Sequence, residues 1–234
     1  MVTPTTANED EETDTTRQRV GGRPSQISRE QIVAAARRIP QGELTMQAVA
    51  DALGVSRKAL HYYVGNRQGL INLVVADLFE SALATVDLPR DADWQTVLQV
   101  WAHAIRDGVV QVGVGATYVQ LRGMGGAAAM ELSERVIESL VGAGFSHLLA
   151  RRALTVVANV AFTHANIALL EEQHGIYPHE YELASALAQA PDDKFPGLRN
   201  VLACAQAEDP SHSFEFELDL AVSGLERALA TQSG

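Results

Sequence analysis

Cysteine is nearly absent from the sequence. The single cysteine among 234 residues, Cys204, excludes an intramolecular disulfide and fits a reducing compartment. The first 16 residues (MVTPTTANEDEETDTT) lack the apolar core of a signal peptide, and no apolar run approaches the ~18 residues that a membrane span needs. We therefore expect a cytoplasmic protein that does not enter a membrane.

The sequence also lacks the signatures of several enzyme classes. The glycine-rich stretch GVGATYVQLRGMGG at 113–126 has no Walker lysine and follows no strand pattern, so a phosphate-binding loop is not expected. No Gly-x-Ser-x-Gly elbow and no Cys/His pair at catalytic spacing occurs. The chain is therefore not expected to be an enzyme.

Basic residues are the minority, with 18 Lys and Arg against 29 Asp and Glu and a formal net charge of −11. They are unevenly distributed. Residues 17–67 hold nine bases and three acids, whereas residues 68–234 hold nine bases and 21 acids. This asymmetry favours a small part that binds a polyanion, attached to a larger acidic body.

Apolar residues recur at helical spacing through most of the chain, and no alternation typical of strands stands out. Residues 1–24 lack this periodicity and are expected to form a flexible N-terminal arm. Ser28 begins a Ser-x-x-Gln capping box, which predicts a helix that Pro40 ends. One short helix is expected in the proline-punctuated segment 178–210. Longer helices are expected at about 67–84, 127–141, 146–173 and 212–229.

The segment LTMQAVADALGVSRKALHYYVGNRQGL, residues 44–70, has the pattern of a helix-turn-helix. Ala50 allows two helices to approach closely, Gly54 supplies a permissive backbone between them, and Val55 and Leu60 provide buried contacts. The second helix exposes side chains long enough to reach base edges in a major groove: Arg57, Lys58 and His61. The alternative is an ordinary three-helix packing unit.

The order of capped helix, helix-turn-helix and long helix resembles the DNA-binding domain of TetR-type repressors. Its specific marks are the Leu-x-x-x-x-Val-Ala-x-x-Leu-Gly-Val-Ser pattern and the Tyr-Tyr-Val run ahead of Asn66 and Arg67. The stretch HSFEFELDLAVSGLERAL at 212–229 resembles the closing dimerisation helix of the tetracycline-repressor subgroup. The resemblance implies an all-α protein with a helix-turn-helix domain at 25–72 and a ligand-binding and dimerisation domain at 73–234.

The resemblance also implies a function. It predicts a homodimeric, ligand-responsive repressor that binds a palindromic DNA operator and is released by a hydrophobic or amphipathic molecule. An antibiotic-like compound is one candidate inducer. Two alternatives are a helical small-molecule-binding protein whose helix-turn-helix is purely structural, and an enzyme that modifies a molecule bound in the helical domain.

Carried over position by position, the resemblance assigns DNA contacts to nine residues. Base-reading positions are Gln47, Arg57, Lys58, Ala59 and His61, and phosphate-contacting positions are Thr45, Ser56, Tyr62 and Arg67. The chemistry agrees, because Arg and Lys donate to guanine edges and Gln can pair with adenine. Tyr63 is open between a DNA contact and a core position.

Three arginines precede the first predicted helix, Arg17, Arg19 and Arg23. They are either part of a solvated tail or an arm that enters the minor groove beside the helix-turn-helix.

The ligand-binding positions depart from those of tetracycline repressors. The position of their metal-ligating histidine holds Val119, and their polar drug-binding positions hold Leu83, Trp101 and Ile105. Neither tetracycline nor a bound metal is therefore expected, and no cofactor is implied. We expect an apolar inducer cavity with a few polar side chains, lined by Leu83, Trp101, Ile105, Tyr118, Val119, Arg122, His164 and Ile167.

Two further expectations concern helices 146–173 and 212–229. Their apolar faces are expected to be buried between two copies of the chain as a four-helix bundle, with Leu218 and Leu225 at the interface. His164, Glu171 and His174 can share one helix face, which suggests a metal site, although scattered helical histidines are usually solvated or hydrogen-bonded core residues.

Overall fold

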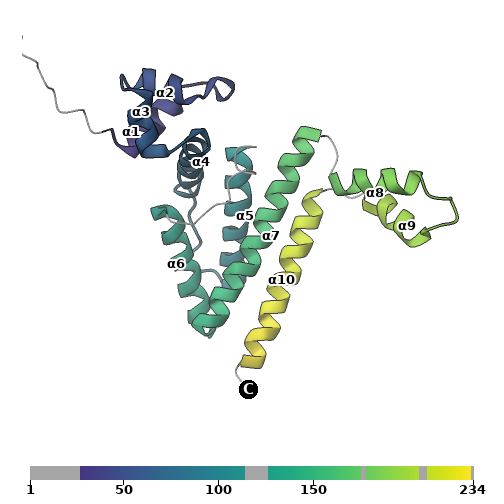
Figure 1. The fold of residues 1–234 in the computed structure, drawn as a ribbon. Helices are drawn as coiled ribbons and strands as arrows, with labels where there is room; N and C mark the ends of the chain where they lie inside the picture. Colours follow the sequence, from purple (N-terminus) through teal and green to yellow (C-terminus); the bar gives the residue numbers. More distant parts are fainter. Residues whose placement is uncertain (1–26, 114–125, 175–177, 206–209, 233–234) are drawn as a thin grey trace, which may run out of the picture.

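The computed structural model describes residues 27–113, 126–174, 178–205 and 210–232 (Figure 1). These residues form ten α-helices and one 3-10 helix and contain no strand, which confirms the predicted all-α fold. In chain order the elements are α1 (Arg29–Ala36), η1 (Gln41–Glu43), α2 (Met46–Ala52), α3 (Arg57–Val64), α4 (Arg67–Leu83), α5 (Trp94–Val112), α6 (Ala127–Gly142), α7 (His147–His174), α8 (Pro178–Ala188), α9 (Pro196–Ala205) and α10 (Pro210–Gln232).

The predicted capping box at the start of α1 is present. The Gln31 backbone N–H donates to Ser28 Oγ at 3.2 Å, and the Ser28 N–H donates to Gln31 Oε1 at 2.9 Å. The helix ends at Ala36, and Pro40 lies four residues further on, where its ring would prevent the helix from continuing.

We call residues 27–66, which contain α1 to α3, the reading head. It has a small hydrophobic core of its own, completed by the first turns of α4. Ile32 from α1, Val49 from α2, Leu60 from α3 and Leu70 from α4 are fully buried in this core. Each helix of the head thus contributes at least one side chain that fixes its position.

We call α5, α6, α7 and α10 the body. Its centre is α5, which contacts α4, α6, α7 and α10. Figure 1 shows α7 and α10 running side by side along the body, with α6 on the side away from α10. The largest fully buried side chains of the body core include Trp101, Ile105, Leu140, Leu169 and Leu218.

Helix α4 belongs to both cores. Leu70 and Val74 pack in the core of the reading head, whereas Phe79 and Leu83 pack in the core of the body. The predicted domain boundary at residue 72 therefore lies inside one continuous helix, which connects the head to the body.

Helix α10 packs on its own chain more fully than the sequence analysis expected. Leu218 and Leu225, which we placed at a dimer interface, are buried in the body core. Two polar pairs also join α10 to α5. Gln95 Nε2 donates to Glu226 Oε1 at 2.8 Å, and Gln99 Nε2 donates to Asp219 Oδ1 at 3.1 Å. The assignment of these two leucines to an interface between copies was therefore wrong. The apolar side chains that α10 leaves exposed are Phe216 and Leu220.

The segment after α7 contains two helices, α8 and α9, where one was predicted. They contact each other and form a hairpin that projects from the body on the side opposite α6 (Figure 1). The guanidinium of Arg199 on α9 holds the turn, since it donates to the backbone oxygens of Leu187, Ala190 and Pro191 at 2.9–3.2 Å. This arginine was not among the residues singled out from the sequence.

The expectation about apolar run length also needs correction. Within α7, His147–Glu172 is long and apolar enough to cross a membrane by length and composition alone. A core helix passes the same test, and α7 packs against α5, α6 and α10. Ala150, Ala161 and Leu169 are fully buried there.

Candidate DNA-binding surface and ligand-binding core

The helix-turn-helix has the geometry that its sequence predicts. Gly54 follows α2 with φ +66°, a left-handed conformation that favours glycine, and the Val55 N–H donates to Ala50 O at 3.0 Å. Ala50 and Leu60 are completely buried between the helices. The turn therefore fixes α3 relative to α2.

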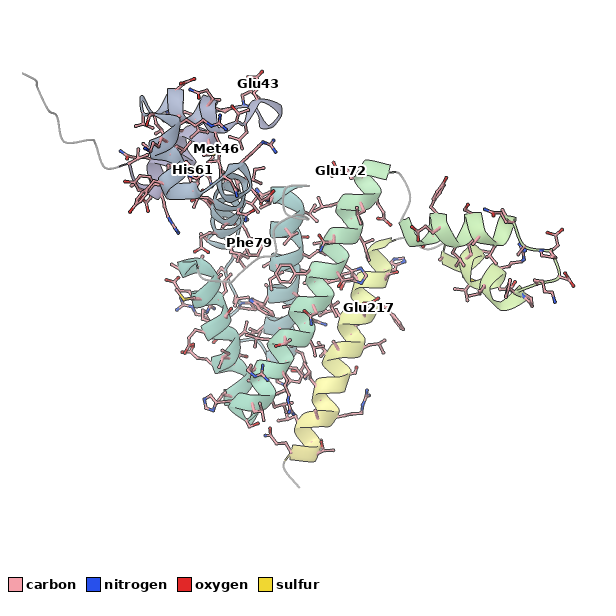
Figure 2. The ribbon with its side chains drawn as sticks, viewed as in Figure 1. Glu43, Met46, His61, Phe79, Glu172 and Glu217 are labelled. Atoms are coloured by element: carbon pink, nitrogen blue, oxygen red, sulfur yellow. The ribbon has the colours of Figure 1, made fainter. Side chains whose placement is uncertain are left out.

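The predicted base-reading side chains lie on the exposed side of this motif. Arg57, Lys58 and His61 on α3 are exposed, as is Gln47 on α2, while Ala59 is half-buried. Figure 2 shows His61 on the reading head. The structure thus brings long basic side chains together on one helix that is anchored by the buried Leu60.

The predicted phosphate contacts lie at the starts of α2, α3 and α4 and within α3. The Thr45 and Ser56 hydroxyl oxygens accept the N–H groups of Ala48 and Ala59, each at 3.1 Å, so both residues cap the helices that follow them. Their hydroxyl protons can still be donated to a phosphate. Tyr62 is 86% exposed, and Arg67 begins α4 as an exposed residue.

Gln47 has a partner that the sequence analysis did not consider. Its Nε2 donates to Asp51 Oδ1 at 2.7 Å, one turn further along α2. Gln47 would have to give up this bond to pair bidentately with adenine, and Asp51 adds a negative charge beside this predicted base-reading position. The acid was visible in the sequence at the helical spacing of four residues.

The open question about Tyr63 has a structural answer. Its ring is half-buried and packs against the core of the reading head, and the ring of Tyr62 meets it edge-on with centroids 5.6 Å apart. Tyr63 therefore supports the exposed Tyr62 from beneath.

Two further features, not among the predicted site residues, orient α4. An added Cβ at Gly69 would collide with the carbonyl of Val64, so only glycine fits where α3 runs into α4. Arg37, just after α1, pairs with the carboxylate of Asp77 and donates to Ser81 Oγ at 2.8 Å. The Arg37 contact has no short-range signal in the sequence, since Arg37 and Asp77 are 40 residues apart.

Several predicted site residues lie outside the described residues. These are Arg17, Arg19 and Arg23 of the N-terminal arm and Tyr118, Val119 and Arg122 of the ligand-binding set.

The three apolar ligand-binding candidates come together in the body core. Leu83 on α4 and Trp101 and Ile105 on α5 belong to one buried cluster, and Trp101 is only 1% exposed. They are therefore core residues in this conformation, and a ligand that contacts them has to displace neighbouring side chains.

His164 on α7 is the polar member of this region. It is 5% exposed, and its Nε2 lies 3.2 Å from Glu217 Oε2 on α10 without the geometry of a hydrogen bond. Figure 2 shows Glu217 on the part of α10 that faces α7. The His164 ring also packs on the ring of Phe214, with centroids 5.3 Å apart. Ile167, the next candidate on α7, is half-buried.

Phe214 gathers further charged and aromatic groups around it. The Arg106 guanidinium lies over its ring at 5.3 Å from the centroid, and the His103 ring meets it edge-on at 5.0 Å. His103 Nε2 is 3.3 Å from Glu215 Oε1. Together these side chains offer an aromatic surface and nitrogen donors to a polar group of a ligand. Only His164 was among the predicted ligand-binding residues.

Glu171 follows His164 by two turns on α7. Burial raises its pKa, repulsion by Glu180 raises it further, and the nearby His164 lowers it. Among the described side chains, no group of three or more His, Cys, Asp or Glu residues is placed to hold a metal ion.

A groove of about 570 Å³ lies between the loop after α4 and helix α6. Its walls combine apolar side chains with two arginines, and they do not include the predicted ligand-binding residues. The lining residues are Leu88, Pro89, Arg90, Ala92, Val97, Arg135, Glu138 and Ser139.

The chain is similar to known tetracycline repressors and to a family domain described from them. Residues 88–229 match the family model described as "Tetracyclin repressor-like, C-terminal domain". The chain is 29% identical over 183 residues to Tetracycline repressor protein class A from transposon 1721 of Escherichia coli, covering 78% of this chain and 81% of that protein. It is 27% identical over 189 residues to Tetracycline repressor protein class C of Escherichia coli, covering 80% and 84%.

Solved structures share the fold. Apo ActR from Streptomyces coelicolor aligns with a TM-score of 0.64 at 22% identity, covering 89% of this chain and 99% of that chain. A possible TetR family transcriptional regulator from Streptomyces coelicolor A3(2) aligns with a TM-score of 0.64 at 26% identity, covering 86% and 100%. The matched family domain covers more than half of this chain. The chain therefore belongs to the TetR family of transcriptional regulators.

Proposed function

We propose that the protein is a homodimeric repressor that binds a palindromic DNA operator and releases it when a small molecule binds. The observation that carries this proposal is the exposed set Arg57, Lys58 and His61 on α3, a helix anchored by the buried Leu60. Basic side chains on a rigidly held helix suit readout of the major groove. Two curated relatives are tetracycline repressors by name, which supports the same function.

Exposed apolar side chains on α7 and α10 support a dimer. Leu148 and Val156 on α7 and Phe216 and Leu220 on α10 are all more than two-fifths exposed in the single chain. Two helices running side by side with outward apolar residues can form a four-helix bundle with the same pair from a second copy. We assign the interface to these residues, and no longer to Leu218 and Leu225.

The inducer is proposed to be a hydrophobic or amphipathic molecule that binds in the body without a metal ion. Apolar area around Leu83, Trp101 and Ile105 favours such a ligand by ~25 cal/mol per Å² buried. His164 and Arg106 beside Phe214 supply donors for a polar group. Structures of the fold relative ActR hold (S)-DNPA and actinorhodin, which makes an antibiotic-like compound a suitable first class to test.

Induction follows from a population shift. In the bound dimer the two reading heads must enter successive major grooves about 34–36 Å apart. A ligand that binds better to a conformation with another spacing of the heads lowers operator affinity by its differential affinity for the two states. The continuous α4 connects the ligand-binding body to the head in each copy. We also propose that the protein acts in the cytoplasm and has no enzymatic role, since its family is one of DNA-binding regulators.

Selection of DNA by the purified protein tests the proposal. Fragments selected from a random-sequence library should be enriched for a palindrome. Its half-sites should lie about 10–10.5 bp apart, or a multiple of that distance, because successive major grooves are one helical turn apart. Binding should weaken steeply with salt, because phosphate contacts release counterions. Absence of both enrichment and salt-dependent binding would contradict the repressor function and favour a structural helix-turn-helix.

Release of the selected DNA tests the inducer class. Actinorhodin and other multi-ring compounds should release DNA in the presence of a metal chelator. Release by tetracycline that occurs only with added magnesium would contradict a metal-free apolar site.

A further inference from the structure

One turn of α4 contacts both halves of the molecule. We call residues 77–81 the junction turn. On the side of the reading head, Arg37 pairs with the Asp77 carboxylate and donates to Asp77 O at 3.2 Å and to Ser81 Oγ at 2.8 Å. The end of α1 is thereby attached to α4 well beyond the core of the head.

The same turn is wedged into the body. Phe79 lies in the body core and packs against Gly108 of α5, where an added Cβ would stand 3.1 Å from its ring. Its ring also faces Phe162 of α7, with centroids 6.5 Å apart. Figure 2 shows Phe79 at the level where α4 meets the body.

Glu80, the next residue of the junction turn, completes the first turn of α6. The residue before α6 is Gly126, which has no side chain to cap the helix. The Ala128 N–H donates to Glu80 Oε1, and the Ala129 N–H lies 3.4 Å from Oε2. A carboxylate at this position satisfies free N–H groups and interacts favourably with the positive end of the helix dipole.

Gly126 is part of the same arrangement. A Cβ added there would overlap the carboxylate of Glu80, and the three nearest atoms it would meet all belong to that carboxylate. The glycine therefore leaves room for a cap supplied by another helix. Its own backbone is extended, with φ −78° and ψ 156°, the conformation in which a residue usually caps its own helix.

We propose that Glu80 is a positioning residue that couples α6 to the reading head. The Arg37 contacts fix the junction turn to the head, and the Glu80 carboxylate fixes the same turn to the N-terminus of α6. When the reading head shifts, the junction turn moves with it. The hydrogen bonds that the Glu80 carboxylate accepts from the N-terminus of α6 therefore become stronger or weaker. The inference rests on the proposed DNA-binding function, because DNA is the ligand that repositions the head.

A cap that only stabilises α6 is the competing explanation, and a pair of variants separates the two. Glu80→Ala removes the cap. Glu80→Ala combined with Gly126→Asp restores a carboxylate and the net charge on the helix itself, in the space that Glu80 has vacated, but without a link to α4. Gly126→Ala alone displaces the carboxylate of Glu80 from the opposite side. The matched control is Glu134→Ala, which removes an exposed carboxylate from the same helix.

The readout is amide hydrogen exchange at Ala128 and Ala129 in the full-length protein, with and without DNA selected by the wild type. Because coupling is reciprocal, DNA binding should change these exchange rates in the wild type and in Glu134→Ala by at least about twofold. Glu80→Ala and Gly126→Ala should accelerate exchange by roughly two- to thirtyfold and abolish its response to DNA. The double variant should recover slow exchange and still show no response.

Two results would overturn the proposal while leaving the proposed function intact. The first is wild-type protein that binds DNA without any change in exchange at these two amides. The second is a double variant whose exchange responds to DNA as the wild type does, which would make Glu80 a structural cap only. Failure of the wild type to bind any selected DNA would remove the proposed function and the coupling together.

Discussion

The reading head and the body use exposed and buried residues in opposite ways. In the head, the candidate functional side chains Arg57, Lys58 and His61 are exposed, and the core beneath them serves only to hold them in place. In the body, the candidate ligand-binding side chains Trp101 and Ile105 are themselves the core. Substitutions of these exposed residues in the head should therefore change DNA binding without changing the free energy of unfolding. Substitutions of the core residues in the body should change both the ligand response and the free energy of unfolding.

The largest contrast is expected within α10, between Leu218 and Leu220. Leu218 is 0% exposed and Leu220 is 54% exposed. Leu218→Glu buries a carboxylate in the body core and should lower the free energy of unfolding by more than ~4 kcal/mol. Leu220→Glu should keep the helical circular dichroism and split the dimer.

Thermal unfolding and sedimentation at matched protein concentration distinguish these outcomes. A folded monomer from Leu218→Glu with an unchanged melting temperature would show that this leucine does face a second copy. An intact dimer from Leu220→Glu would remove this residue from the interface.

Two aromatic residues extend the comparison between head and body. Trp101→Ala should lower the free energy of unfolding by ~3–5 kcal/mol, because it leaves a cavity in the body core. Tyr62→Ala should change it by no more than ~0.5 kcal/mol while weakening DNA binding. Denaturant unfolding and DNA titration of each variant check both expectations.

Trp101→Phe is the better probe of the inducer site, since it keeps most of the buried ring. It should alter the concentration of multi-ring compound needed to release DNA and leave DNA affinity without the compound unchanged. An identical release curve would place the inducer elsewhere, with the groove near Arg90 and Arg135 as the next site to examine.

Within the head, base and phosphate contacts should have separable effects. Arg57→Ala should lose ~1–3 kcal/mol of discrimination between the selected sequence and its single-base variants. Arg67→Ala should weaken binding to all sequences and reduce the salt slope by about one. Arg151→Ala, an exposed base on α7, is the matched control and should do neither. Equal affinity, specificity and salt slope in both head variants would show that α3 is not the recognition helix.

The N-terminal arm offers a smaller test of the charge on the head. Deleting residues 1–24 removes Arg17, Arg19 and Arg23 and should reduce the salt slope of DNA binding by up to about three counterions. Deleting residues 1–16 removes five acids and no bases, so DNA affinity should stay equal or rise. An unchanged salt slope after the longer deletion would identify the arm as a solvated tail.

Local interactions explain what the sequence could predict in the head. The capping box at Ser28, the Gly54 turn and the alternation of buried Leu60 with exposed Arg57 and His61 all depend on residues a few positions apart. A single helix period therefore indicates both the core positions and the exposed positions that are candidates for DNA contact.

Long-range contacts in the body and at the junction have no comparable local signal. Apolar walls of a pocket and apolar core residues follow the same periodicity, so Leu83 and Trp101 could not be assigned to one or the other by pattern. The Glu80 cap joins residues 48 positions apart, and the Gly126 that permits it reads in the sequence as part of a glycine-rich stretch. Leu218 is buried because α10 packs on α7 and α5 of its own chain, and no local pattern in the sequence indicates this packing.

The smallest expected effect concerns Glu171, a half-buried carboxylate at the end of α7. Burial, and then repulsion by Glu180, raise its pKa in the folded protein above the ordinary value of a glutamate. Ionising Glu171 therefore costs more in the folded than in the unfolded chain, and stability falls as the pH rises through its folded pKa. Glu171→Gln should raise the free energy of unfolding near pH 7 by a few tenths of a kcal/mol, roughly, after solvent screening. This gain should vanish in acid, below the ordinary glutamate pKa, where both states of the wild type are protonated. Denaturant titrations at several pH values, with Glu172→Gln as the exposed control, measure it. A gain that persists unchanged at low pH would mean that the substitution acts through packing, so the charge of this body residue would not limit stability.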